Sequence, residues 1–96
     1  MDVVVTYDIR TTTSAGERRL ARVARVCESY GVRVQYSVFE CRLSSARLQR
    51  LMFNLADEID PRVDSINIYR FDGALTEMRT SLGRRTWREP GDAWIV

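Results

Sequence analysis

The chain has 96 residues and a mass of 11.1 kDa, which is enough for one small domain but not for two separate hydrophobic cores. Hydrophobic residues make up 45% of the sequence and charged residues 29%, proportions that exclude a disordered or collagen-like chain. All 15 basic residues are arginine and histidine is absent, so a histidine base, a histidine zinc site and a lysine Schiff base are excluded within one chain.

Arginines are concentrated in two segments, although the net charge is only +2. Residues 17–33 hold five arginines and two glutamates, and residues 79–88 hold four arginines and no acid. Basic patches on an otherwise acidic chain indicate a polyanionic partner, because guanidinium groups match the geometry of phosphate oxygens. The alternatives are a solvated helix face for the first patch and a flexible solvated arm for the second.

A first strand is expected at residues 3–7, where β-branched residues without alternation predict apolar neighbours on both faces. Asp8 follows this strand directly, and a polar loop follows Asp8. A carboxylate on a rigid strand end that faces solvent is typical of a catalytic or metal-binding group. The same position also suits an aspartate that only stabilises a turn.

A first helix is expected from about Ala15, because Ser14 and Glu17 have the spacing of a capping box, and Gly31 is expected to supply its C-terminal stop. The helical wheel separates an apolar face from a basic one. The apolar face contains Leu20, Val23, Ala24, Cys27 and Tyr30, and the basic face contains Arg18, Arg22 and Arg25. Cys27 and Cys41 both lie in apolar patterns, so we interpret them as buried free thiols rather than a disulfide.

Residues 32–43 are rich in strand-forming types but too long for one strand, so we expect two strands or one bent strand with a break near Ser37. Ser44 or Ser45 should cap a second helix that ends at Asp60-Pro61. Its apolar face contains Leu48, Leu51, Met52, Leu55 and Ile59. Phe53 points away from that face, either as a single exposed apolar residue or as part of a protein contact.

A last core strand is expected at residues 65–71. The order strand, helix, strand, strand, helix, strand predicts an α+β, ferredoxin-like fold with two helices on one face of an antiparallel sheet. Since the first and last strands are apolar on both faces, we expect the second face to pack on another copy in a homodimer. We expect one domain over residues 1–96, with a core of about 1–72 and an extension, about 73–96, in dimer or partner contacts. The end Trp94-Ile95-Val96 would form an added edge strand.

The sequence also bears on location. No apolar run approaches the ~18 residues of a membrane span, and the first residues lack a basic signal region. A cytoplasmic protein without a membrane partner is expected.

Two motifs resemble a known family. They are Val5-Thr6-Tyr7-Asp8-Ile9 at the first strand end and Arg33-Val34-Gln35-Tyr36-Ser37-Val38-Phe39-Glu40-Cys41. Together with the arginine-rich first helix and the Asp64-Ser65 pair, they are similar to the small CRISPR-associated endoribonuclease family, the second of the two core spacer-acquisition proteins.

This resemblance implies a homodimer in which paired Asp8 residues share a divalent ion, Mg²⁺ or Mn²⁺. It implies a metal-dependent endonuclease that hydrolyses single-stranded RNA or double-stranded DNA. It also implies a central dimer that bridges dimers of the CRISPR integrase. The alternative is an architectural DNA-binding subunit of that complex without catalysis.

The same resemblance implies the site residues. Tyr7, Asp8 and Arg33 are the catalytic candidates, with Asp8 as the metal ligand. The nucleic-acid-binding candidates are Arg18, Arg19, Arg22, Arg33, Ser37 and Phe39. Alternatives stay open for three of them: Tyr7 packs under Asp8, Phe39 packs in the core or dimer, and Ser37 marks the strand bend.

Overall fold

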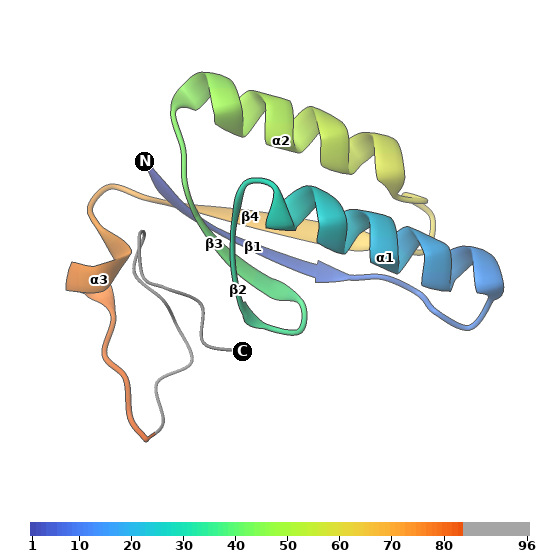
Figure 1. The fold of residues 1–96 in the computed structure, drawn as a ribbon, viewed down its shortest axis with the longest axis horizontal. Helices are drawn as coiled ribbons and strands as arrows, with labels where there is room; N and C mark the ends of the chain where they lie inside the picture. The colour runs from blue at the N-terminus through green and yellow to red at the C-terminus, as the bar shows by residue number, and fades with distance from the viewer. Residues whose placement is uncertain (84–96) are drawn as a thin grey trace.

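The computed structural model describes residues 1–83, which form a four-stranded antiparallel sheet with two long helices on one face (Figure 1). The strands lie in the order β2-β3-β1-β4. In chain order the elements are β1 (Asp2–Asp8), α1 (Ser14–Glu28), β2 (Gly31–Gln35), β3 (Val38–Arg42), α2 (Ser45–Glu58), β4 (Ser65–Phe71) and the short α3 (Leu75–Met78). The predicted α+β order is confirmed. Four features of the predicted C-terminal extension, Arg84, Arg85, Arg88 and Trp94-Ile95-Val96, lie outside the described residues.

Strand β1 is central, because it pairs with β3 on one side and β4 on the other. Val3, Val5 and Tyr7 face the helices and are buried, whereas alternate residues from Asp2 to Asp8 belong to the opposite face. The core lies between the sheet and the two helices. Its buried members are Val3, Val5, Tyr7, Ile9, Val23, Cys27, Phe39, Cys41, Leu43, Leu48, Leu51 and Leu55.

The segment 32–43 forms two strands, as expected, with a turn at Tyr36-Ser37 between β2 and β3. Helix α2 is capped by Ser44, whose hydroxyl accepts a hydrogen bond from the backbone N–H of Arg47 at 3.2 Å. Phe53 on this helix is 75% exposed, as its position on the wheel predicted. Both cysteines are buried and free, which confirms that prediction.

Two predictions about α1, its N-cap and its C-terminal stop, were wrong. Thr13, not Ser14, is the N-cap, since its hydroxyl accepts the hydrogen bond of the Gly16 N–H at 3.0 Å. The helix ends at Glu28, and Gly31 has no positive φ but opens β2, where a Cβ would lie 2.4 Å from the Sγ atom of Cys41. Leu20 is 36% exposed, so it lies at the margin of the apolar face.

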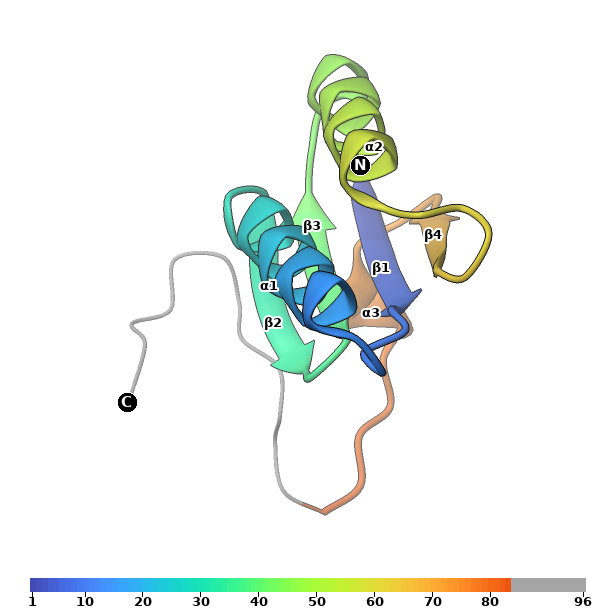
Figure 2. The ribbon, with the colours of Figure 1, turned by 90° about the vertical axis from the view of Figure 1, so that its right-hand side faces the viewer.

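The sheet face opposite α1 and α2 is partly covered by the chain itself. The segment around α3 lies against that face, where the Leu75 N–H donates to Oδ2 of Asp2 at 2.8 Å and Arg79 pairs with Glu40 (Figure 2). Tyr69 on the same face stays 53% exposed. The expectation that another molecule covers this face therefore applies to part of it only.

Within residues 1–83, none of the helices combines the length and the apolar character that a membrane crossing requires.

Candidate functional site

A surface depression of about 540 Å³ lies at the end of β1, between α1 and the β2–β3 turn. It brings together four of the residues that the sequence singled out. These are Tyr7, Asp8, Arg33 and Ser37. Side chains of α1 and of the loop before it complete the wall, together with the turn residue next to Ser37. These are Ile9, Thr11, Glu17, Leu20, Ala21, Ala24 and Tyr36.

Asp8 is the last residue of β1, where its backbone pairs with Ser65, and its side chain is exposed. Among residues 1–83, no side chain or backbone N–H pairs with this carboxylate. The strand thus fixes the backbone of Asp8 while leaving the charge uncompensated. A carboxylate in this state is available to a cation or to a donor on a substrate.

Tyr7 lies under this site with only 6% of its surface exposed. Its hydroxyl donates a hydrogen bond to the carbonyl oxygen of Tyr36 at 3.1 Å, and its ring stacks near that of Phe39. Burial raises the pKa of Tyr7, although the Arg33 guanidinium acts in the opposite direction. The phenol therefore stays protonated at neutral pH and serves to hold the turn, which supports the packing alternative for Tyr7.

Arg33 places its guanidinium over the ring of Phe39, 5.1 Å from the centroid, and 3.6 Å from Oε1 of Glu28. The side chain is still 40% exposed, so part of the guanidinium faces the depression. Phe39 has no exposed surface. In this structure Phe39 therefore packs in the core and is not placed to stack on a base.

The three helix arginines are in different states. Arg19 bonds both carboxylate oxygens of Asp64, at 2.8 and 3.4 Å, and its side chain is only 15% exposed. Arg22 pairs with Glu58 at 2.7 Å and is 41% exposed. Arg18 is exposed, and within residues 1–83 its guanidinium is not paired. Of the three, Arg18 is best placed to bind a phosphate.

Sequence reasoning gave Asp64 no structural role. Besides Arg19, its carboxylate accepts hydrogen bonds from the N–H groups of Arg10 at 3.0 Å and Asp60 at 2.9 Å. Arg19 foremost, with these N–H groups, lowers the pKa of Asp64 to about 2. The hydrogen bonds of Asp64 therefore connect the loop after β1, helix α1 and the loop before β4. The sequence signals for Asp64 were its position directly before a strand and the resemblance of the Asp64-Ser65 pair to the family.

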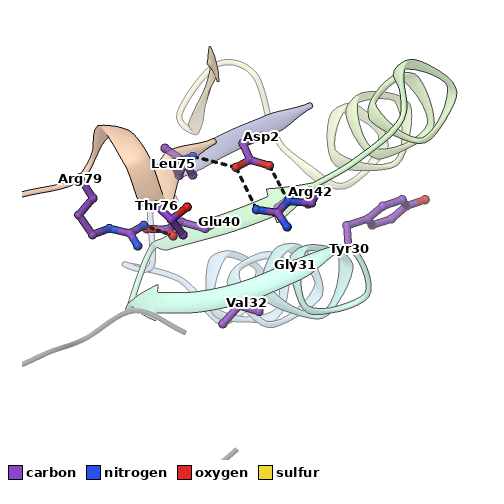
Figure 3. A pocket seen from close by; sticks show the side chains of 10 residues that line it. Asp2, Tyr30, Gly31, Val32, Glu40, Arg42, Leu75, Thr76 and Arg79 are labelled. Carbon is purple, nitrogen blue, oxygen red and sulfur yellow. Dashed lines mark hydrogen bonds and ion pairs between the residues drawn. The ribbon is translucent and has the colours of Figure 1, made fainter. Parts of the chain in front are cut away.

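A smaller cavity of about 200 Å³ lies between α3 and the β2–β3 side of the sheet (Figure 3). Its carboxylates are paired: Asp2 accepts from Arg42 at 3.0 Å and from the Leu75 N–H, and Glu40 pairs with Arg79. A cation would have to displace an arginine here, so this cavity is a poor metal site.

The fit of a divalent ion to the Asp8 site depends on the number of ligands. Within the described part of the chain, no group of three or more acidic or cysteine side chains lies close enough to hold a metal. Asp8 alone offers one carboxylate, which suits Mg²⁺ if water, phosphate or a second Asp8 supplies the other ligands. The residues therefore fit a shared site and not a closed one within a single chain.

Comparison with known proteins places these features in context. The family model for CRISPR associated protein Cas2 matches residues 1–78. The CRISPR-associated endoribonuclease Cas2 of Chlorobaculum tepidum is 51% identical over 69 residues, 72% of each chain. The CRISPR-associated endonuclease Cas2 of Halalkalibacterium halodurans is 47% identical over 70 residues, 73% of each chain.

A solved structure gives the same result. The crystal structure of Streptococcus pyogenes Cas2 at pH 6.5 is similar to this chain with a TM-score of 0.77 and 42% identity. The match covers 86% of this chain and 100% of that one. The resemblance expected from the two motifs is thereby confirmed.

Proposed function

Since the chain belongs to the Cas2 family of CRISPR-associated proteins, we propose that it is a spacer-acquisition protein that hydrolyses phosphodiester bonds as a metal-dependent endonuclease. The observation that carries this proposal is Asp8, a carboxylate fixed at the end of the central strand, exposed and without a partner in residues 1–83. The names of the relatives, endoribonuclease and endonuclease, support the reaction class. Single-stranded RNA and double-stranded DNA are the two substrates to test.

A ferredoxin-like homodimer is part of the proposal. The order β2-β3-β1-β4 with α1 and α2 on one face supports the fold, and the exposed Tyr69 on the other face supports a second copy there. Because side chains alternate along β1, the side chain of Asp8 belongs to this second face. A two-fold axis close to the end of β1 would bring two Asp8 carboxylates together and supply the missing ligand.

Four residues of the depression would then have separate tasks. Two Asp8 carboxylates would hold Mg²⁺, or Mn²⁺ in its place. When bound, such an ion polarises phosphoryl oxygens and lowers the pKa of a bound water. Arg33 would neutralise phosphate charge with its exposed guanidinium, and Ser37 would donate a hydrogen bond to a phosphate oxygen. Tyr7 keeps the turn in place through its bond to the Tyr36 carbonyl.

The test is Asp8→Asn, which keeps the size of the side chain and removes its charge. Cleavage of single-stranded RNA and of duplex DNA in Mg²⁺ should fall by about 100-fold or more. Asp57→Asn is the matched control, because Asp57 is also exposed and unpaired within the described residues but lies on α2. Cleavage by Asp8→Asn at the rate of the control would refute the proposal.

A second candidate is an architectural subunit that holds DNA between CRISPR integrase dimers without cleaving it. Arg18 and Arg25 favour this role, since both are exposed on α1 and neither is paired within residues 1–83. Phosphate contacts of this kind give salt-dependent binding that does not depend on sequence. If Asp8→Asn still supports spacer insertion while the Arg18→Ala, Arg25→Ala double variant does not, the architectural role is the relevant one.

A further inference from the structure

We propose that the depression beside Asp8 binds one unpaired base of a single-stranded nucleic acid, with the ring of Tyr36 as its stacking platform. The inference rests on the proposed nuclease function and adds a specificity residue to it. The base slot is defined here as the space between Tyr36 on the β2–β3 turn and the α1 residues Glu17, Leu20, Ala21 and Ala24.

Tyr36 is 92% exposed, although a tyrosine ring is a large apolar surface. Its backbone is nevertheless held firmly at both ends of the turn. The Tyr7 hydroxyl donates to the carbonyl oxygen of Tyr36, and the Tyr7 N–H donates to the carbonyl oxygen of Ser37, each at 3.1 Å. The protein thus presents a ring with little packing of its own on a well-anchored turn. This is the arrangement of an aromatic platform for a base.

The α1 side of the base slot is apolar except for Glu17. Leu20, Ala21 and Ala24 of α1 line it with aliphatic side chains, and the two alanines are small enough to leave room for a flat group. The whole depression measures about 540 Å³, within the range of sites that bind small organic groups. The size and the apolar wall suit a base, whereas the phosphate contacts of the depression are Arg33 and Ser37.

The charged residues of the depression also favour a base as the group that occupies the slot. Glu17 lines the depression, and within residues 1–83 its carboxylate is not paired. A carboxylate accepts hydrogen bonds from the amino groups of bases. Arg33 lies on the same depression and can bind the phosphate of the neighbouring nucleotide. One nucleotide can therefore place its base beside Tyr36 while the backbone passes Arg33 and Asp8.

Stacking on Tyr36 requires a base that is free of its partner strand. The base slot therefore favours single-stranded over intact duplex substrates, because a paired base would first have to leave its stack. This preference is the property that separates the proposal from general phosphate binding.

The experiment measures binding of a short single-stranded RNA that carries 2-aminopurine, and of the duplex DNA of the same sequence, in EDTA so that cleavage cannot occur. Tyr36→Ala should weaken binding of the single strand by roughly 5- to 150-fold, the loss of one stacked base, and should leave duplex binding within about twofold. Tyr36→Trp should retain tight binding. The quenching of 2-aminopurine fluorescence should be lost in Tyr36→Ala and kept in Tyr36→Trp.

Phe53→Ala is the matched control, since Phe53 is a 75% exposed aromatic residue on α2, outside the depression. Single-strand binding by Tyr36→Ala equal to that of Phe53→Ala would overturn the proposal. An equal loss for single strand and duplex would overturn it as well, because the ring would then act through general contacts. Thermal denaturation verifies that each variant is folded.

Asp8→Asn separates this inference from the proposed nuclease function. If Asp8→Asn cleaves RNA normally while Tyr36→Ala loses single-strand binding, the base slot stands and the catalytic role of Asp8 falls. If Asp8→Asn abolishes cleavage while Tyr36→Ala binds and cleaves like the wild type, the nuclease stands and the base slot is wrong. With both correct, Tyr36→Ala raises the KM for single-stranded RNA by the same factor as the loss of binding and changes kcat little.

Discussion

The two ends of β1 carry aspartates on the same face of the sheet in opposite surroundings. Asp2 is 7% exposed and bonds Arg42 and the Leu75 N–H. Asp8 is exposed, and no partner for it lies in residues 1–83. The residue type is identical, so the difference lies in what the rest of the chain brings to each end. A carboxylate whose donors are all in place stabilises the fold, and one without donors is free to bind a ligand.

Asp64 extends the comparison, because its side chain has no exposed surface and accepts bonds from one guanidinium and two backbone N–H groups. The three aspartates thus form a series from fully to not at all engaged. Stability should therefore depend most on Asp64 and least on Asp8, and activity should depend most on Asp8.

The largest loss of stability is expected for Asp64→Ala. The change leaves Arg19 and two partly buried N–H groups without their acceptor, and should lower the free energy of unfolding by about 2–4 kcal/mol. Urea unfolding followed by circular dichroism measures it, with Asp57→Ala as the exposed control. A loss no larger than that of the control would show that Asp64 is not a structural tie.

The next largest effect should be a loss of folding stability at low pH, through the paired carboxylates of Asp64 and Asp2. Arg19 first among the causes lowers the pKa of Asp64 to about 2, and the bond to Arg42 lowers that of Asp2. Both values lie below the ordinary value of about 3.9, so as the pH falls the unfolded chain takes up protons before the folded one.

The stability from these two groups is therefore complete above about pH 4 and is lost as the pH falls toward about 2. The thermal midpoint of the wild type should drop over this window, and that of Asp64→Asn should drop less. Parallel curves for the two proteins would contradict the assignment.

Asp2→Ala should have an intermediate effect. It removes the acceptor of the Leu75 N–H and the partner of Arg42, which is 52% exposed, and should cost about 1–2 kcal/mol. Because Leu75 opens α3, backbone hydrogen exchange near residues 75–79 should rise more than in the rest of the chain. If Asp2→Ala raises hydrogen exchange no more at residues 75–79 than in the rest of the chain, Asp2 does not anchor α3.

Asp8→Asn should change stability least, by no more than about 0.5 kcal/mol, because no bond in residues 1–83 is lost. The same variant should lose metal-dependent cleavage. Urea unfolding and a cleavage assay on one preparation test both halves. A destabilisation as large as that of Asp2→Ala would place Asp8 among the structural carboxylates.

The sequence predicted the elements well where the signal was local. The turn at Tyr36-Ser37, the Ser44 cap and the exposed Asp8 all followed from patterns within a few residues. At the start of α1 the adjacent residues Thr13 and Ser14 both carry a hydroxyl that could cap the helix, and Thr13 is the N-cap in the structure. The loop after β1 packs directly on the helix at Gly16, because a Cβ there would lie 2.0 Å from the Arg10 carbonyl oxygen.

The state of the helix arginines could not be predicted in the same way. Arg19 and its partner Asp64 are 45 positions apart, and nothing near Arg19 in the sequence distinguishes it from Arg18. The fold brings Asp64 to one of them and leaves the other exposed. Pairings of this kind depend on how β4 is placed beside β1, which is a tertiary property.

The most direct test of the shared Asp8 metal site is a crystal of the protein soaked in Mn²⁺ and examined by anomalous scattering. We expect an ion held between the Asp8 carboxylates of two copies related by a two-fold axis, and no such signal in Asp8→Asn. Two Asp8 side chains that face away from each other in every assembly, with Mn²⁺ bound elsewhere or not at all, would contradict it.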